Sequence, residues 1–431
     1  MCLGGKGTLV NLVTADHDSF MQQQQQQQQV QSLFLDLFVI HQQQSLSTTN
    51  KLIRPEPTDL QAVLKNGKHK EEDKEEEEKK DNMQSWATIA AAVALLANGA
   101  VAQNMLRFAC SQLVVDRVDP LVNPGVRYTP HLHQIVGGNS FNLTMDPDSH
   151  DLAGQSTCTS CSFAQDLSNY WTAVMFFKAK NGSYHRVPQV GNGGPQGKLV
   201  NNGGLDIYYI PSGKVTAFRP GFRMLAGNAA NTDPKKVSSG NICHRCWTST
   251  NEGNFIGGAP CTGSDTVDIP QDTKCKMIRQ TIIFPTCWDG KNLDSPDHKS
   301  HVAYGGGSGA NGGGSCPSTH PVKLPQIMYE LMWNVTSFAD KSMWPESGPA
   351  FVYSMNLGGP AAHGDYVFGW KGDSLQKAMD KGCNLNKDCP SAGLTAQTPA
   401  QYNACTIKQQ APEPVDGWLK AMPMGEMAIK A

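Results

Sequence analysis

The chain has 431 residues, with 36 lysines and arginines, 38 aspartates and glutamates, and 13 cysteines. A formal net charge of −2 gives no electrostatic basis for binding nucleic acid or an anionic membrane surface, so neither is predicted as a partner. The cysteine content favours a protein of an oxidising compartment, where disulfides form and persist.

Residues 1–82 differ in composition from the rest of the chain. An uninterrupted glutamine tract runs from Gln22 to Gln29, and an acidic run occupies residues 71–78. These are low-complexity segments with no durable hydrophobic period. We expect this leader to be an overextension of the coding sequence, with translation beginning at Met83. The alternatives are a disordered cytosolic tail and a type II membrane anchor.

Residues 83–102 have the composition of a secretory signal peptide. Ala87 to Leu96 form its apolar centre, and Ala100-Val101-Ala102 is a small-residue cleavage site. The centre is shorter than the roughly 20 apolar residues that a membrane-spanning helix needs. The segment predicts a secreted protein, extracellular or associated with the cell wall, whose mature chain begins near Gln103 and has no membrane segment.

The cysteines and glycosylation sequons point to the same location. One cysteine, Cys2, lies in the leader, and the other twelve form an even set that predicts up to six disulfides. Two C-x-x-C pairs in this set could instead be zinc knuckles, but disulfides are the better interpretation for a secreted chain. Sequons for N-glycosylation occur at Asn142, Asn181 and Asn334. The disulfide candidates are Cys110, Cys158, Cys161, Cys243, Cys246, Cys261, Cys275, Cys287, Cys316, Cys383, Cys389 and Cys405.

Residues 103–405 are expected to form a single secreted β-rich domain, followed by a polar C-terminal tail over residues 406–431. Apolar runs flank Asn181-Gly182, a dipeptide that favours a hairpin turn. A second hairpin is predicted to turn at residues 211–214. Residues 324–338 alternate apolar and polar side chains, which predicts a strand with one buried side. The best helix covers residues 374–381 and ends at Gly382.

Long segments with a helical period are scarce, while glycine, proline and asparagine recur throughout. Short strands joined by ordered loops are therefore expected. The predicted fold is mainly β, a jelly-roll-like β-sandwich with long disulfide-bonded loops and few short helices.

The densest group of ionisable side chains lies between Cys287 and Tyr304, and further histidines occur in "PHLHQIVGG", "CPSTHPV" and "HGDYVFGW". Histidine exchanges protons near neutral pH, and a carboxylate can orient it or act as acid, base or nucleophile. We expect these loops to contribute to one site, although each such residue could instead cap a turn. The candidate catalytic residues are Asp294, Asp297, His298, His301, His363 and Asp365.

A second set of side chains is expected to contact the substrate. Trp288 and Trp370 lie beside the ionisable groups, and flat aromatic faces bind sugar rings well, although core packing is the alternative for any tryptophan. His131 and His133 share one face of a strand and resemble a metal-binding pair. No third ligand follows from their spacing, so no metal or other cofactor is predicted. The substrate-contact candidates are His131, His133, His320, Trp288, Trp370, Tyr304 and Glu330.

Six ordered blocks carry a family resemblance: "HLHQIVGGNSF", "TSCSFAQDLSNYWTA", "FRPGFRMLAGNA", "FPTCWDGKNLDSPDHKSHVAY", "CPSTHPVKLPQIMYELMW" and "HGDYVFGW". They resemble a family of secreted fungal proteins catalogued as a domain of unknown function and often joined to WSC carbohydrate-binding modules. The resemblance covers residues 114 to 389. It implies extracellular, cell-wall-associated work and supplies no established reaction.

The expected function is action on an extracellular or cell-wall polysaccharide by a monomeric protein. The preferred hypothesis is glycan cleavage in a groove lined by Asp and His, either by a glycoside hydrolase or by a polysaccharide lyase. For a hydrolase the candidate carboxylates are Asp297 and Asp365, with Glu330 as a third. The rival hypotheses are a non-catalytic cell-wall or glycan-binding protein and a surface protein that binds metal through its histidines.

Overall fold

The computed structural model describes residues 105–190, 203–237, 240–248, 259–307, 310, 312–383, 389–425 and 429–430. These residues all belong to one compact unit that spans residues 100–431. The expected leader, the signal peptide and the start of the mature chain lie outside the described residues.

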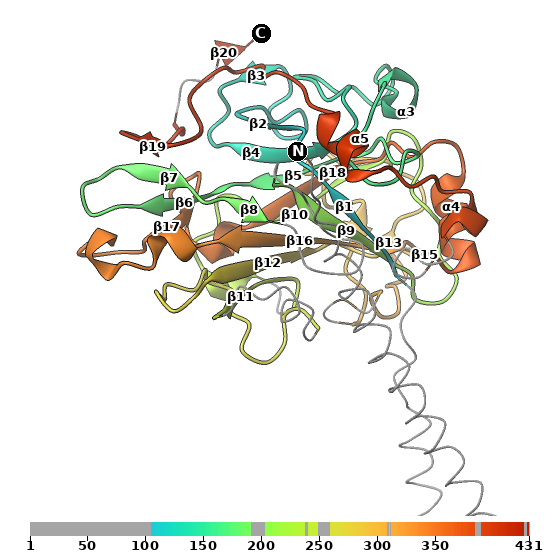
Figure 1. Ribbon diagram of the computed structural model, residues 1–431. Coiled ribbons are helices and arrows are strands. Elements are labelled where there is room, and N and C mark those ends of the chain that lie inside the picture. The colour runs from blue at the N-terminus through green and yellow to red at the C-terminus, as the bar shows by residue number, and fades with distance from the viewer. Residues whose placement is uncertain are drawn as a thin grey trace, which may run out of the picture. The chain divides into compact units, whose positions relative to one another are not determined.

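Two large antiparallel sheets form the body of this unit (Figure 1). We call them sheet A and sheet B. Sheet A has the strand order β1 (Leu106–Cys110), β9 (Leu205–Ile210), β16 (Gln326–Asn334), β12 (Met277–Ile283) and β11 (Ile242–Trp247), with β8 (Gln189–Val190) also paired to β16. Sheet B has the order β10 (Arg223–Gly227), β18 (His363–Val367), β5 (Asn169–Ala173), β4 (His133–Gly137) and β2 (Val114–Asp116). The predicted mainly β sandwich is confirmed.

The sheets pack face to face through a core that is rich in tyrosine. The Tyr209 hydroxyl of sheet A donates to the Tyr366 hydroxyl of sheet B at 3.1 Å and lies 2.8 Å from the Tyr170 hydroxyl. The Tyr170 and Tyr329 rings meet edge to face, with centroids 5.8 Å apart. Hydroxyls that bond to one another allow these large rings to be buried without leaving unpaired polar atoms.

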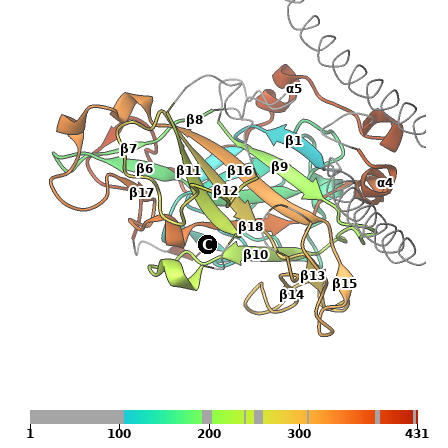
Figure 2. The same cartoon turned by 90° about the horizontal axis from the view of Figure 1, so that it is seen from below.

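The long strand β16 departs from the prediction of one buried side. Residues Gln326 to Trp333 are all buried. Ile327, Tyr329 and Leu331 face the core between the sheets, while the opposite face is covered by small apolar clusters and by ion pairs such as Arg279–Glu330. The polar members of the alternation are thus buried beside partners rather than exposed to solvent. Figure 2 shows β16 between β9 and β12.

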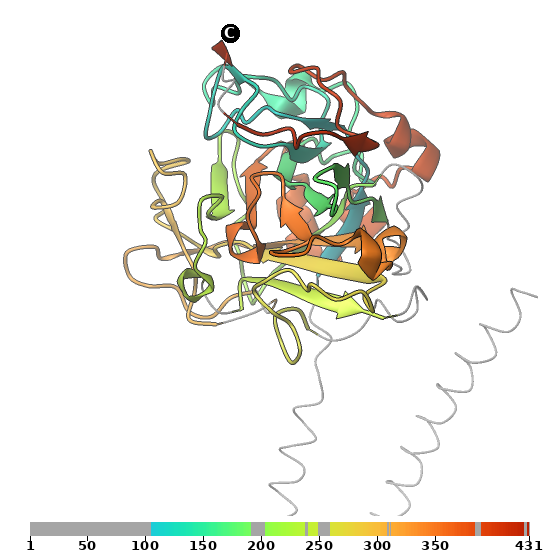
Figure 3. The ribbon, with the colours of Figure 1, turned by 90° about the vertical axis from the view of Figure 1, so that its left-hand side faces the viewer.

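The second face of sheet B is covered by the segment of residues 113–152 and by part of the C-terminal segment. Val118, Phe141 and Leu152 pack with Trp171 and Val367 in one buried apolar cluster. Figures 1 and 3 show this covering layer, including α3 (Leu152–Gln155), on the side of sheet B that faces away from sheet A. Sheet B is therefore buried on both faces.

Part of the expected C-terminal tail belongs to the fold. The Asp116 carboxylate on β2 accepts the backbone N–H groups of Gln410 and Ala411, and Ala411 is fully buried. Further along, β19 (Trp418–Leu419) pairs with β7 (Tyr184–Arg186). Residues 410–419 thus pack against the domain.

Smaller sheets extend the two large ones. The hairpin predicted at Asn181-Gly182 is confirmed: β6 and β7 pair around this turn, where Gly182 has a φ of +82°. The hairpin predicted at residues 211–214 is wrong, because both edges of β9 are occupied by β1 and β16. The remaining strands are β17 (Phe351–Tyr353), β6 (Met175–Lys178), β13 (Cys287–Trp288), β14 (Val302–Ala303), β15 (Val322–Lys323), β3 (Val126–Arg127) and β20 (Ile429–Lys430).

The helices are short, as expected. The predicted helix is confirmed as α4 (Ser374–Lys381), which ends at Gly382 in the left-handed conformation with a φ of +68°. No helix of the described residues is long and apolar enough to cross a bilayer. The other helices are α5 (Pro399–Ala404) and the 3-10 turns η1 (Pro234–Lys236), η3 (Thr336–Phe338), η4 (Lys341–Met343), η5 (Gly359–Ala361) and η6 (Cys389–Ala392).

All twelve candidate cysteines are paired, so the predicted disulfides are confirmed. Neither C-x-x-C pair closes on itself, because each of the four cysteines bonds to a more distant partner. The pairs are Cys110–Cys161, Cys158–Cys405, Cys243–Cys261, Cys246–Cys275, Cys287–Cys316 and Cys383–Cys389. Of the three sequon asparagines, Asn142 and Asn181 are exposed and Asn334 is half-buried at the end of β16.

His244 on β11 is expected to make stability depend on pH. It is fully buried, with Nδ1 2.9 Å from the Val267 carbonyl and Nε2 2.6 Å from the Tyr353 hydroxyl. Burial lowers the pKa of His244 to about 4. Between the ordinary pKa near 6.5 and pH 4, the unfolded chain binds a proton that the folded chain excludes. The stabilisation is therefore complete above pH 6.5 and falls by about 3 kcal/mol as the pH drops to 4.

The test is urea unfolding of the wild type and His244→Gln at pH 7 and pH 4.5. Glutamine can donate to Val267 and accept from Tyr353 but does not titrate, so the variant should lose less stability between the two pH values. An equal loss in both proteins would show that His244 does not carry this effect.

Candidate metal centre

Three histidines meet on the outer face of sheet B. His133 on β4 lies directly opposite Ala173 on β5, and Thr172, the preceding residue, lies opposite Gly364 on β18. Directly paired residues share a face of a sheet, so His133, Ala173 and His363 point to the same side. The small Ala173 side chain leaves room for the two imidazoles to meet across β5.

Gly364, between His363 and Asp365, allows β18 to lie close to the core aromatics. A Cβ atom at this position would come within 2.9 Å of the Tyr329 and Phe284 rings. The Tyr329 hydroxyl also donates to the Asp365 carbonyl at 2.5 Å. The backbone that carries the histidine and the aspartate is thus held by the core on its other face.

The ring nitrogens of the three histidines converge. His363 Nε2 lies 3.1 Å from His131 Nε2 and 3.4 Å from His133 Nε2. One ligand atom from each of the three side chains lies within 4.8 Å of the others. His133 is fully buried, and His131 and His363 are 8% and 2% exposed. We call this group the His cluster.

The Nε2 atoms of His133 and His363 face each other with their lone pairs and carry no hydrogen. His133 Nδ1 lies 3.2 Å from the Val118 carbonyl, and His363 Nδ1 lies 3.0 Å from the Ala361 carbonyl. A carbonyl oxygen only accepts, so each Nδ1 carries the hydrogen, and a neutral imidazole then has none on Nε2. His133 Nε2 and His363 Nε2 therefore face each other as acceptors, an arrangement that a cation between them would stabilise.

At neutral pH the rings are not protonated, so the lone pairs of His133 Nε2 and His363 Nε2 still face each other. Burial lowers the pKa of His133 to about 4, and burial with the neighbouring imidazoles lowers the pKa of His131 well below its usual value. Burial, followed by the charge of His133, also lowers the pKa of His363. The three rings are thus neutral near pH 7, the form in which imidazole binds metals.

The spacing of the nitrogens fits a tetrahedral metal site. With metal–nitrogen distances near 2.0–2.1 Å, two ligands of a tetrahedral zinc ion lie about 3.3 Å apart. The two separations of 3.1 and 3.4 Å bracket this value, and the remaining pair of ligand atoms lies within 4.8 Å. The hydrogen bonds from Nδ1 to backbone carbonyls are the outer contacts that orient histidine ligands in metal sites.

Two buried carboxyl groups, those of Asp365 and Asp119, lie beside the His cluster. Asp365 Oδ2 is 4.0 Å from His363 Nε2, the side chain is fully buried, and neither carboxylate oxygen has a hydrogen-bond partner. Burial, and then the charge of Asp119, raises the pKa of Asp365 well above its usual value. Asp119 is 3% exposed and accepts the backbone N–H groups of Leu121 and Val122.

Asp119 is the residue of this neighbourhood that sequence reasoning missed. Its charge interacts with His363, yet it lies 244 positions earlier in the chain, in "DRVDPLV", with no histidine adjacent to it. The covering segment of sheet B places it here. The sequence contains no local signal that could have identified it.

The loop predicted to be catalytic forms hydrogen bonds that hold its own backbone. Exposed Asp297 accepts the backbone N–H of Ser300 and the Ser295 hydroxyl, each at 2.8 Å. These hydrogen bonds lower the pKa of Asp297, which therefore stays ionised. His301 is buried, with Nδ1 2.8 Å from the Ser295 hydroxyl and Nε2 2.8 Å from the Arg223 carbonyl. Both ring nitrogens of His301 thus have partners.

The same loop runs along the free edge of β10. His298 Nδ1 lies 2.7 Å from the Asp294 carboxylate, and the His298 carbonyl accepts the Leu225 N–H at 2.9 Å. Half-buried Lys299 donates to the Gly227 carbonyl, opposite His363 in the sheet register, and its charge acts on Asp365. The loop therefore borders β10, the neighbour of the strand β18 that carries His363 and Asp365. The side chains of Asp294, Asp297, His298 and His301 are engaged by the loop itself or by Arg223 on β10.

The remaining candidates lie apart from the His cluster. Trp288 and Trp370 are 2% and 1% exposed, so neither ring face is available to a sugar. Glu330 lies in sheet A, where it accepts from the Tyr208 hydroxyl. His320 is bonded to the Ser300 carbonyl, and Tyr304 donates to the Ile283 carbonyl while its ring remains 36% exposed.

A second close grouping, Cys110, Cys161 and Asp166, does not offer metal ligands. Its two sulfur atoms are joined in a disulfide, so they are not thiolates. Among the described residues, the His cluster is thus the grouping whose donor atoms are free to bind a metal.

Comparison with known proteins yields one match. The family model of a domain of unknown function, DUF1996, matches residues 119–370, a segment that begins at Asp119 and contains the His cluster and Asp365. No curated protein and no solved structure matches the chain.

Proposed function

The chain belongs to the DUF1996 family of domains of unknown function, and we propose that it is an extracellular metal-binding protein whose His cluster holds a divalent transition-metal ion. The observation that carries the proposal is the convergence of three buried Nε2 atoms at separations of 3.1 and 3.4 Å. A three-nitrogen donor set with imidazole ligands suits zinc, copper or nickel better than calcium or magnesium, which prefer oxygen ligands.

Asp365 is the natural fourth ligand. A small movement of its side chain would bring Oδ2 from 4.0 Å to the roughly 3.3 Å that separates ligands of a tetrahedral ion. A divalent ion would also neutralise the charge of two buried carboxylates, Asp365 and Asp119. Near-complete burial of all three histidines favours a closed site that stabilises the fold over an open site that presents a bound water to substrate.

Six disulfides and sequons at exposed Asn142 and Asn181 support the extracellular location. Of the alternatives raised by the sequence, this arrangement favours a metal-binding or glycan-binding protein over a glycan-cleaving enzyme. The buried His cluster offers no open group to a polymer, and exposed Asp297 is engaged by its own loop. Action on extracellular polysaccharide remains part of the proposal, as binding.

The test is metal analysis of the protein secreted by a eukaryotic host from its full coding sequence and purified without a histidine tag. We expect the purified protein to contain about one zinc, copper or nickel ion per chain. If it is purified without metal, or is stripped with a chelator, calorimetric titration should show uptake of about one Zn²⁺ per chain. Calcium and magnesium serve as hard-ion controls and should not bind at the same site. A folded protein that takes up none of the three transition metals would overturn the proposal.

Replacing Asp365 by asparagine should have opposite effects on the metal-free and metal-loaded protein. Without metal the variant should be more stable by about 1 kcal/mol, because a buried carboxylate without a hydrogen-bond partner is lost. With metal it should bind the ion more weakly, because a negative charge beside the ion is lost. Urea unfolding and zinc titration of each form measure both effects.

The matched control is Asp268→Asn, which neutralises an exposed carboxylate. It should change neither quantity. A metal-free Asp365→Asn protein that is markedly less stable than the wild type would show that the carboxylate has a stabilising partner.

A further inference from the structure

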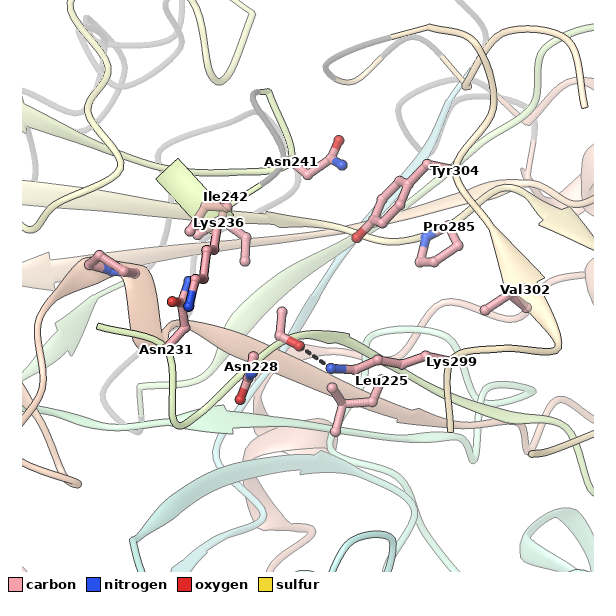
Figure 4. A pocket seen from close by; sticks show the side chains of 13 residues that line it. Leu225, Asn228, Asn231, Lys236, Asn241, Ile242, Pro285, Lys299, Val302 and Tyr304 are labelled. Atoms are coloured by element: carbon pink, nitrogen blue, oxygen red, sulfur yellow. Dashed lines mark hydrogen bonds between the residues drawn. The ribbon is translucent and has the colours of Figure 1, made fainter. Parts of the chain in front are cut away.

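A cavity of about 350 Å³ opens beside the edge strand of sheet B. It lies between β10, the start of β11 and the segment that follows β14. Its volume is at the lower end of the range that small-molecule sites occupy, roughly 300–1,000 Å³. Figure 4 shows Asn228, Asn231 and Lys236 on one side and Pro285, Val302 and Tyr304 on the other. We call it the β10 pocket.

The charged residues that line the β10 pocket are both cations. Lys236 and Lys299 are among its described lining residues, and no aspartate or glutamate is. Lys236 is exposed and forms no ion pair with a described residue, so its ammonium group is available to a ligand. Lys299 is held by its hydrogen bond to the Gly227 carbonyl, which fixes its direction at the pocket floor (Figure 4). A ligand with a negative charge is therefore favoured.

Three asparagines add neutral hydrogen-bonding groups. Asn228 and Asn231 use their side-chain oxygens to accept the backbone N–H groups of Ala230 and Asp233, which orients their amide nitrogens. The Asn241 side chain has no hydrogen-bond partner among the described residues, although the residue is 6% exposed. Side-chain amides both donate and accept, and they suit the hydroxyl groups of a sugar.

The other walls of the β10 pocket are apolar. Leu225, Ile242 and Val302 contribute aliphatic surface, and Tyr304 contributes a partly exposed ring whose hydroxyl is fixed on the Ile283 carbonyl. A pyranose ring has an apolar face and a rim of hydroxyls, so it can use both kinds of wall. The pocket thus combines a cationic, an amide-lined and an apolar side.

Arginines that could have supplied a cationic groove are used elsewhere. The Arg219 guanidinium lies over the Trp288 ring at 5.0 Å, and Arg223 is buried and donates to the Met145 carbonyl at 2.6 Å. Neither lines the β10 pocket. Recognition of a carboxylate there would depend on the two lysines.

We propose that the β10 pocket binds a carboxylated sugar, as in a uronic acid unit of an extracellular polysaccharide. The inference rests on the proposed extracellular location, where the protein would meet such a polysaccharide, and it does not depend on the metal ion. It names the class of glycan that the protein would bind.

The test is calorimetric or NMR titration of the full secreted protein with D-glucuronate, and with glucose and acetate as probes of the sugar and the carboxylate alone. Glucuronate should bind about tenfold more tightly than either probe. Lys236→Gln should weaken glucuronate binding about tenfold, since one charge-assisted hydrogen bond is lost. Lys235→Gln, at the adjacent exposed lysine outside the pocket lining, should not.

Equal binding of glucose and glucuronate, or equal effects of the two lysine variants, would overturn the proposal. If acetate binds as tightly as glucuronate, the pocket recognises an anion without its sugar, and the proposal is overturned as well. Metal content is measured on the same samples. A protein that binds glucuronate without metal refutes the metal centre alone, and a metal-loaded protein that does not bind glucuronate refutes this inference alone.

Discussion

Replacing His363 by glutamine is expected to abolish stoichiometric metal binding. His363 Nε2 is the nitrogen that lies within 3.4 Å of both other histidines. Its loss leaves His133, the first residue of β4, and His131, which precedes β4 and so is not in the strand that the sequence predicted for both. Loss of an outer contact typically weakens a metal site 10–100-fold, and loss of a direct ligand should exceed about 100-fold. Calorimetric titration of metal-free wild type and variant with Zn²⁺ measures the difference.

The same variant should lose the stabilisation that zinc provides. A ligand present at about 1,000 times its dissociation constant stabilises a folded protein by about 4 kcal/mol. Wild type should therefore unfold at higher urea concentration when zinc is added, and His363→Gln should not respond. His320→Gln, which removes a histidine bonded to the Ser300 carbonyl, is the control and should behave as wild type. An equal zinc response in His363→Gln would place the ion elsewhere.

Removing the Cys158–Cys405 disulfide should cause the largest loss of stability. This bond joins residues 247 positions apart, and the chain-entropy relation assigns about 5 kcal/mol to a loop of that length. Cys405 is 2% exposed in the apolar cluster that covers the outer face of sheet B. The double variant Cys158→Ala/Cys405→Ala should thus unfold at much lower urea concentration than the wild type.

The comparison variant is Cys383→Ala/Cys389→Ala, whose bond spans a separation of 6. The same relation assigns about 2 kcal/mol to it. Equal losses in the two double variants would show that loop length does not determine the contribution of these bonds. Neither bond includes a residue of the His cluster, so we expect zinc to raise the stability of both proteins.

Local signals in the sequence identified local structure well. Asn181-Gly182 predicts the β6–β7 turn because few other dipeptides tolerate its backbone conformation, and Gly382 predicts the end of α4 for the same reason. Residues 211–214 carry a similar turn signal, but the partners of β9 come from distant parts of the chain. Turn residues show where a strand ends and not which strand it pairs with.

The assembly of the His cluster could not be predicted from local sequence signals. His131 and His133 are recognisable as a pair, whereas His363 joins them through the pairing of β4, β5 and β18. The density of Asp and His in residues 289–304 has a second source, because short loops with many turns also use such side chains to accept backbone N–H groups, as Asp289 and Asp297 do. The two groups differ in their partners: both ring nitrogens of His301 have a hydroxyl or carbonyl partner, whereas the Nε2 atoms of the His cluster face one another, which only the assembled sheet brings about.

The segment shared with the family, residues 119–370, is shorter than the unit that folds. Strands β1 and β2 precede it, and Cys405 and the segment that bonds to Asp116 follow it. A protein expressed from those boundaries alone would lose the pairing of β1 with β9 and of β2 with β4, and it would leave Cys158 and Cys161 without their disulfide partners. Such a fragment should aggregate and form mixed disulfides between molecules, so recombinant work on this protein needs both flanks of the shared segment.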